Sequence, residues 1–161
     1  MKLLIVRHGD PDYDIDSLTE KGWKEVEYLS QKLSKLDVKA FYVSPLGRAK
    51  DTAAPTLKKM GRTATECEWL KEFPCQIWRP DVKDKKILAW DWLPQDWMAD
   101  ERFFQYDHWF ENEAMQEGHV KEEYDRVIGE FDKLLAKHGY ERKGHYYKVN
   151  EENNDLSLIH I

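Results

Sequence analysis

Residues 3–9, Leu-Leu-Ile-Val-Arg-His-Gly, constrain the fold of this chain more than any other stretch. Four consecutive apolar residues run into Arg7, His8 and Gly9, which predicts a short buried strand that ends at a turn. In open α/β sheets, functional sites form just beyond the carboxyl ends of the strands. An imidazole beside a guanidinium at such an end has the groups needed to attack a phosphoryl group. An inert surface turn remains the alternative interpretation of this triplet.

The rest of the chain predicts further strands and helices in alternation, which is the pattern of an α/β fold. Thr19 is a good N-cap for a helix that we expect to end at Leu36. Ser44 as N-cap and Pro45 at the first helical position predict a second helix, which Gly61 would end. We expect a last helix over 120–138 and strands over 40–43, 65–70, 144–149 and 156–161.

Arg48 falls in the first turn of the helix that follows the second strand. The start of a helix attracts anions through its unpaired N–H groups and its dipole, so a cation there opposes the dipole. Helix stability therefore does not explain Arg48. It is better explained as facing an anion shared with the site after the first strand, and an exposed arginine without a role is the alternative.

Residues 74–118 lose clear periodicity and are broken up by prolines. A structureless loop of this length would be unusual, so we expect an inserted subdomain with short helices that partly covers the site. Its aromatic side chains are more often a satellite core than a ligand platform. Five of the seven tryptophans lie here: Trp78, Trp90, Trp92, Trp97 and Trp109.

Length and charge limit the possible classes of protein. A chain of 161 residues predicts one domain, and its net charge of −6 disfavours a nucleic-acid partner without disfavouring an anionic substrate. Cys67 and Cys75 predict neither a disulfide framework nor a zinc site. No apolar run approaches the ~18 residues that span a bilayer, and no signal peptide precedes the first strand. We therefore expect a cytoplasmic protein with no membrane partner.

The acidic stretch 10–16 has three possible interpretations. A calcium loop begun at Asp10 would need glycine at its sixth position and glutamate at its twelfth, where this chain has Ile15 and Lys21. An Asp-x-Asp after a strand also resembles the nucleophile motif of haloacid dehalogenases, although there the first aspartate follows the strand directly. A solvated acidic loop is the preferred interpretation, with the dehalogenase-like enzyme as the weaker alternative.

Three separated motifs give the chain a family resemblance: Arg7-His8-Gly9, Leu18-Thr19-x-x-Gly22, and Ser44-Pro45-Leu46-x-Arg48-Ala49-x-x-Thr52-Ala53. Their order and context resemble the histidine phosphatases of the phosphoglycerate mutase-like superfamily. The resemblance covers the first ~75 residues, gives little over 74–118 and returns weakly at the last helix and strand. It implies a three-layer α/β/α fold with a mostly parallel sheet, here with a Trp-rich insertion at about 74–118 in a single domain over 1–161.

The resemblance also implies roles for individual residues. His8 would be the nucleophile that forms a phosphohistidine, which water then hydrolyses. Arg7 and Arg48 would bind the phosphoryl oxygens. Glu72 matches the acid that protonates the leaving oxygen, with Glu68 and Glu66 as the other candidates. Such an acid must be held partly neutral, so we expect Glu72 in a water-poor or anionic pocket.

His160 matches the second histidine of the family, at the end of a late strand. The family usually has glycine after this histidine, whereas this chain has Ile161. His160 is the candidate for the fourth phosphate ligand. Family members continue through at least one more helix and strand, so we expect this chain to lack the C-terminal part of the domain.

The resemblance thus predicts a phosphate-monoester hydrolase that needs no metal and no organic cofactor. Its substrate would be a small phosphorylated metabolite or a phosphoprotein. Two alternatives remain open: a phosphoglycerate mutase-type enzyme that returns the phosphoryl group to its substrate, and an inactive module that only binds phospho-ligands.

Overall fold

The computed structural model of this protein describes residues 1–150 and 154–161. It divides the chain into two compact units. The first contains residues 1–72 and 132–161, and the second is Phe73–Phe131. The Trp-rich insertion predicted at 74–118 lies within the second unit.

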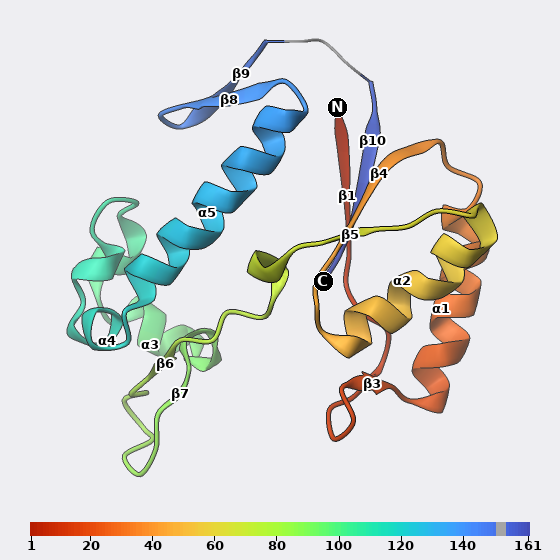
Figure 1. Cartoon of the computed structure of the whole chain (residues 1–161). Coiled ribbons are helices and arrows are strands. Elements are labelled where there is room, and N and C mark those ends of the chain that lie inside the picture. Colours follow the sequence, from red (N-terminus) through yellow and green to blue (C-terminus); the bar gives the residue numbers. More distant parts are fainter. Residues whose placement is uncertain (151–153) are drawn as a thin grey trace. The chain divides into compact units, whose positions relative to one another are not determined.

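The first unit is built on a four-stranded parallel sheet in the order β1-β10-β4-β5 (Figure 1). The strands are β1 (Lys2–Val6), β10 (Leu156–His160), β4 (Val38–Val43) and β5 (Thr65–Glu66). His160 pairs with Val6 on one side and with Val43 on the other, so three strands end at the same edge of the sheet. The carboxyl edge on which the predicted site depends is therefore present.

The third strand is shorter than the predicted 65–70. Val43, the last residue of β4, already pairs with Glu66, so the residues that follow have little strand left to pair with. They form the 3-10 helix η1 (Glu68–Leu70) instead.

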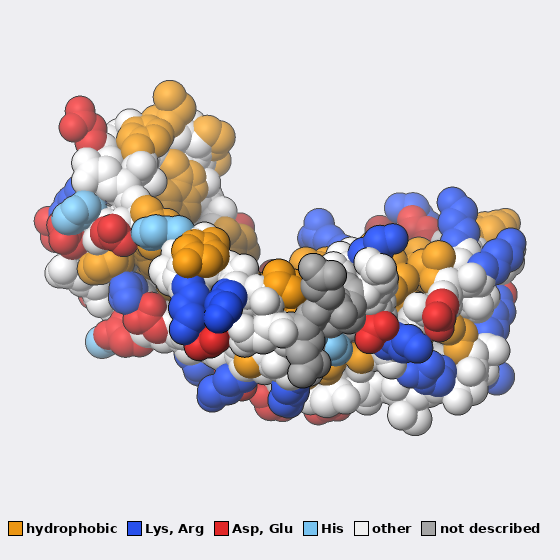
Figure 2. All heavy atoms as spheres, turned by 90° about the horizontal axis from the view of Figure 1, so that it is seen from above, with side chains coloured by type: hydrophobic (Ala, Val, Ile, Leu, Met, Phe, Trp, Pro, Cys, Tyr) orange, Lys and Arg blue, Asp and Glu red, His pale blue; other side chains and the backbone are white. Residues whose placement is uncertain are grey.

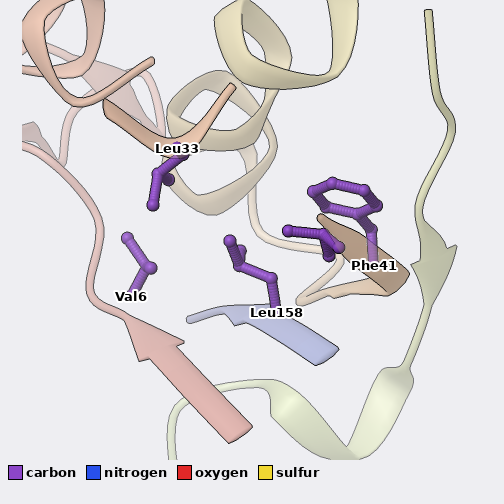
Figure 3. Packing of buried hydrophobic residues seen from close by; sticks show 5 residues of the cluster. Val6, Leu33, Phe41 and Leu158 are labelled. Atoms are coloured by element: carbon purple, nitrogen blue, oxygen red, sulfur yellow. The ribbon is translucent and has the colours of Figure 1, made fainter. Parts of the chain in front are cut away.

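Helices cover both faces of this sheet. Figure 1 shows α1 (Glu20–Leu33) and α2 (Gly47–Met60), which contact each other, on one side of it. Successive strand residues point to opposite faces. Figure 3 shows the core beneath α1 and α2, formed by Val6, Leu33, Val38, Phe41 and Leu158. The neighbouring residues Tyr42 and Ile159 pack on the other face against Leu134 of α5 (Val120–Lys137). The predicted three-layer α/β/α fold is confirmed.

Helix α2 begins two residues later than predicted, at Gly47 rather than at Pro45, directly after Ser44. The Ser44 N–H donates to the carbonyl oxygen of His160 at 3.0 Å, so Ser44 continues the sheet instead of capping the helix. Arg48 nevertheless lies in the first turn, and Gly61 ends the helix in the left-handed conformation, as predicted. Thr19 caps α1, also as predicted.

The predicted strand over 144–149 is one half of a hairpin. β9 (Tyr146–Val149) pairs antiparallel with β8 (Tyr140–Lys143), a strand that the sequence did not reveal because it is short and mostly polar. Arg142 of β8 donates from Nε to Asp132 of α5 at 2.6 Å, which ties the hairpin to the helix.

The second unit consists of short elements, as predicted for the Trp-rich segment. Its core contains Ile77, Ala89, Trp92, Met115 and Val120, so Trp92 belongs to a satellite core rather than to a ligand platform. Its strands are β6 (Gln76–Ile77) and β7 (Ile87–Leu88), and its helices besides the start of α5 are η2 (Ala89–Asp91), α3 (Pro94–Met98), η3 (Glu101–Phe104), η4 (Trp109–Glu111) and α4 (Glu113–Glu117).

Charged side chains of both signs are interspersed over the face seen in Figure 2. This mixture accords with the high charged fraction, 35% of all residues. In the part of the chain that the structure describes, no helix is both long enough and apolar enough to cross a membrane.

Candidate active site

His8 lies just after β1, in the loop at the carboxyl edge of the sheet. Its backbone N–H donates to the carbonyl oxygen of Ile161 at 2.8 Å, which extends the pairing of β1 with the end of the chain. Its ring atom Nδ1 is 2.7 Å from the carbonyl oxygen of Gly9. Because a carbonyl oxygen can only accept, Nδ1 must carry the proton in this contact, and the lone pair of the neutral ring lies on Nε2. The half-buried imidazole is therefore held in the tautomer that can attack through Nε2.

Thr52 connects the His8 loop to α2. The Gly9 N–H donates to the Thr52 hydroxyl at 3.0 Å, and this hydroxyl donates to the carbonyl oxygen of Arg48 at 2.8 Å. Thr52 is fully buried, so these contacts fix the loop against the helix that carries Arg48. Sequence reasoning included Thr52 in a motif but assigned it no role.

The start of α1 also packs closely against this loop. A Cβ atom at Gly22 would collide with the carbonyl oxygen of Asp10, so only glycine permits this approach. The Thr19 hydroxyl accepts from the Gly22 N–H at 3.1 Å and lies 2.7 Å from the Asp10 carboxylate, to which it donates. The Leu-Thr-x-x-Gly motif thus supports the loop that holds His8.

Arg48 is almost completely buried, with 8% of its surface exposed. One terminal nitrogen donates to Asp16 at 2.8 Å and the other donates to Glu72 at 2.8 Å. The ring of Tyr13 lies under the guanidinium, 5.3 Å from its central carbon, and is also in edge contact with the ring of His8. Nε is buried and has no hydrogen-bond partner among the described residues. Arg48 is therefore not the exposed arginine of the alternative interpretation.

Glu72 contacts Arg48, but its surroundings differ from the prediction. Its side chain is 52% exposed and ion-paired, so the expected water-poor pocket is wrong in this structure. The other two candidates form ion pairs elsewhere, Glu68 with Lys71 and Glu66 with Lys50. Of the three acids, Glu72 is the one shown in contact with another predicted site residue.

Asp16 is the main residue that sequence reasoning missed. It lies in the acidic hairpin, residues 11–18, in which β2 (Pro11–Asp12) pairs with β3 (Ser17–Leu18). One carboxylate oxygen accepts from Arg48 and the other accepts from the Gly47 N–H at 2.6 Å. The Asp16 side chain is 44% exposed, so the preferred interpretation of 10–16 as a solvated loop holds in part but misses these two contacts. The alternating aspartates in the sequence do not distinguish it from its neighbours.

Burial and hydrogen bonding shift the pKa of the Asp16 carboxyl group in opposite directions. Partial burial disfavours the charged carboxylate, but hydrogen bonds from Gly47 and Arg48 outweigh it and lower the pKa of Asp16 below its ordinary value of 3.8. Asp16 is therefore charged at neutral pH.

His160 is fully buried at the end of the central strand. It points to the same face of the sheet as Leu158, the face that α2 covers. Neither ring nitrogen has a hydrogen-bond partner in the described residues. Burial lowers the pKa of His160 from 6.5 to about 4, so its ring is neutral at pH 7.

The structure brings some of the predicted site residues into direct contact and connects others only through neighbouring residues. Arg48 and Glu72 are in direct contact, and His8 is connected to Arg48 through Tyr13 and Thr52. His160 lies at the same sheet edge, while Arg7 is exposed next to His8. Asp10, the nucleophile of the dehalogenase alternative, accepts from Thr19 instead. No group of three potential metal-ligating side chains is present in the described ranges, 1–150 and 154–161.

The model of the histidine phosphatase superfamily (branch 1) matches residues 3–143. The chain belongs to this superfamily. The predicted family is thereby confirmed, and the dehalogenase alternative is wrong. The match ends before His160, so the assignment of that residue to the histidine phosphatase site rests on its place in the sheet.

Known proteins of two kinds are similar to this histidine phosphatase-superfamily chain. A 2,3-bisphosphoglycerate-dependent phosphoglycerate mutase from Thermoplasma acidophilum is 37% identical over 60 residues, which covers 31% of this chain and only 30% of the mutase. The alpha-ribazole phosphatase of Shigella flexneri matches with a TM-score of 0.51 at 17% identity, over 99% of this chain and 73% of that one. A mycobacterial glucosyl-3-phosphoglycerate phosphatase in complex with VO3 matches with a TM-score of 0.53 at 19% identity, over 98% and 74%. These structural matches support the fold.

Proposed function

We propose that this protein hydrolyses phosphate monoesters through a phosphohistidine on His8. The observation that carries the proposal is the contact of His8 Nδ1 with the Gly9 carbonyl oxygen, because it places the lone pair on Nε2. The contact occurs in the loop that Thr52 ties to the helix of the buried Arg48. A nucleophile and a cation for the phosphoryl oxygens are thus held on one support.

In the first step, Nε2 of His8 attacks phosphorus and forms an N–P bond while the bond from phosphorus to the ester oxygen breaks. Glu72 in its protonated form gives its proton to the leaving oxygen, which departs as an alcohol. Arg7 and Arg48 bind the non-bridging phosphoryl oxygens. His160 is the proposed fourth ligand, and because it is fully buried in this structure, substrate binding must first open access to its ring. Because Glu72 is half exposed and ion-paired in this structure, substrate binding must supply part of the surroundings that keep it protonated.

In the second step, the Glu72 carboxylate takes a proton from water as the water oxygen attacks phosphorus. The N–P bond breaks, orthophosphate leaves, and His8 and Glu72 return to their starting states. The proposed cycle needs neither a metal ion nor an organic cofactor, because His8 supplies the nucleophile, the arginines supply the positive charge and Glu72 moves the proton.

The proposed substrate is a small phosphorylated metabolite, with a phosphoprotein as the alternative substrate. The names of the three similar proteins described above refer to small phosphorylated compounds or to their phosphatases. We propose no nucleic-acid or membrane partner.

Trapping the covalent intermediate tests this proposal. The protein is mixed with a 32P-labelled aryl phosphate in excess EDTA, quenched in alkali and analysed for phosphate that is stable to base and labile to acid. We expect the label on the unchanged protein and on His108→Ala, and its absence on His8→Ala. His108 is a suitable control because it pairs with Glu111 in the second unit. Turnover that requires magnesium, or a label that survives in His8→Ala, would refute the proposal.

The similarity to a phosphoglycerate mutase favours one second candidate function. A mutase returns the phosphoryl group to another hydroxyl of its substrate, whereas a phosphatase releases orthophosphate. Incubation with 3-phosphoglycerate and 31P spectroscopy of the products separates the two reactions. Tight phosphate binding with neither product would instead support the inactive binding module.

A further inference from the structure

In the proposed reaction cycle, Arg48 must lose one of the two carboxylates that hold it. Its guanidinium is held in place by Asp16 on one terminal nitrogen and Glu72 on the other. Glu72 must leave this ion pair, because a carboxyl group that is giving its proton to the leaving oxygen cannot also neutralise a guanidinium. A second anchor that stays charged is then needed to keep Arg48 aligned with the phosphoryl oxygens.

Asp16 has the geometry of such an anchor. Its two oxygens accept from Arg48 and from the Gly47 N–H, so the carboxylate fixes the guanidinium relative to the start of the helix that carries it. Its backbone has φ of 47°, which non-glycine residues seldom adopt. A Cβ atom at Gly47 would collide with the carbonyl oxygen of Asp16. This close approach places the Asp16 backbone against the start of α2, and the two hydrogen bonds hold its carboxylate there.

We infer that Asp16 is a positioning residue that keeps the Arg48 guanidinium oriented for the phosphoryl group while Glu72 gives and takes its proton. The inference rests on the proposed function of the site. It assigns different tasks to the two carboxylates: Glu72 touches the reacting atoms, and Asp16 acts only through Arg48.

Two further observations agree with this division of tasks. Hydrogen bonds from Gly47 and Arg48 lower the pKa of Asp16 despite partial burial, so Asp16 is an anion at neutral pH in this structure. The guanidinium of Arg48 is in contact with Asp16, Glu72 and the Tyr13 ring. Its Nε is the nitrogen that has no hydrogen-bond partner among the described residues. An oriented guanidinium can offer this N–H to a phosphoryl oxygen together with a remaining terminal N–H.

The test removes the Asp16 carboxylate without adding backbone strain. Glycine adopts positive φ freely, and asparagine tolerates it better than most residues, so Asp16→Gly and Asp16→Asn should both fold. Asp16→Asn keeps one acceptor oxygen but no charge. Asp14→Gly and Asp14→Asn are matched controls in the same hairpin, because Asp14 is exposed and its carboxylate accepts no hydrogen bond shown in the described part. Melting temperatures of all four variants check that they are folded.

The readouts are kcat and KM for an aryl phosphate, and the affinities for orthophosphate and for vanadate, which mimics the transition state. We expect Asp16→Gly to lower kcat/KM about 10- to 100-fold and to weaken vanadate more than phosphate, since a misplaced group costs most in the transition state. Asp16→Asn should lie between Asp16→Gly and the unchanged protein. A merely structural role would reduce only the active fraction, so that kcat falls while KM and both affinities stay constant.

Each other outcome is also informative. Tighter phosphate binding in Asp16→Gly would show that Asp16 competes with the substrate for Arg48 and would overturn the inference. If the unchanged protein binds phosphate without turnover, the proposed hydrolysis fails, while the two affinities still decide whether Asp16 orients Arg48. If it binds neither phosphate nor vanadate, the inference fails as well.

Discussion

At the scale of single residues, the site depends on the tautomer of His8, the charge of Asp16 and the burial of His160. The Gly9 carbonyl oxygen selects the tautomer of His8, and the hydrogen bonds to Asp16 keep that carboxylate charged. His160 is kept neutral by burial alone. The first depends on one backbone carbonyl group, the second on two hydrogen-bond donors and the third on the exclusion of water.

Glu72→Gln should affect substrates according to their leaving groups. A 4-nitrophenolate leaves readily without a proton, whereas an alkoxide does not. We therefore expect hydrolysis of an alkyl phosphate to fall by roughly 10²- to 10⁴-fold and that of 4-nitrophenyl phosphate by much less. Steady-state rates on the two substrates measure this difference. Glu68→Gln is the control, and equal losses on both substrates would argue against Glu72 as the acid.

His160 should make the protein less stable in acid. Its pKa is 6.5 in the unfolded chain and about 4 when buried, so the unfolded chain binds more protons between these values. The free energy of unfolding should fall as the pH is lowered from about 6.5 to 4, by about 3 kcal/mol in total. Urea titrations at several pH values measure it. His160→Gln should remove this part of the loss while leaving the part that comes from carboxylates with lowered pKa values.

At the scale of elements, two glycines decide how closely the helices approach the loops. Gly22 lets the first turn of α1 pack against the loop after His8, and Gly47 lets α2 begin against Asp16. Both helices start at the carboxyl edge of the sheet, so their N-terminal turns define the support on which the proposed site is built.

Gly22→Ala adds only one methyl group, but we expect it to lower activity markedly. The new Cβ atom would force the Asp10 carbonyl and the His8 loop to shift. We expect kcat/KM for an aryl phosphate to fall about 10- to 100-fold, with a loss of roughly 1–3 kcal/mol in stability. Gly129→Ala in α5 is the control, because no atom lies within 4 Å of the added Cβ and alanine favours a helix by up to about 1 kcal/mol. Unchanged activity in Gly22→Ala would mean that the loop does not depend on this contact.

At the scale of the whole molecule, the two units have separate cores and unequal tasks. All the residues with a proposed role in catalysis or positioning lie in the first unit. The second unit has its own core around Ile77 and Met115. That it partly covers the site, and that the protein is cytoplasmic, remain predictions from the sequence.

Met115→Ala should destabilise the second unit by roughly 2–5 kcal/mol, because its side chain is fully buried. Phosphohistidine formation from a small aryl phosphate should persist below the unfolding temperature. Leu158→Ala, in the core beneath α1 and α2, should cost a similar free energy and also reduce labelling of His8. Thermal unfolding combined with the labelling assay compares the two. Loss of labelling in folded Met115→Ala would show that the second unit contributes to the chemistry.

Much of the fold and part of the site could be predicted because their signals are local. Apolar runs predicted β1, β4 and β10, Thr19 marked the start of α1, and Gly61 marked the end of α2. The short polar strand β8 gave no such signal. The predicted start of α2 failed because the Ser44 N–H is taken by the carbonyl oxygen of His160, more than a hundred residues away in the chain.

The sequence by itself determined the order of the main elements and the place of Arg7, His8 and Arg48 at their ends, since periodicity and capping depend on neighbouring residues. Only the tertiary structure placed β10 between β1 and β4, which puts His160 at the same edge as the His8 loop. It also showed that Asp16 accepts from the Gly47 N–H at the start of α2 and from Arg48, and that Glu72 is half exposed. Strand order, burial and ion pairing arise from contacts between distant residues, which no local pattern encodes.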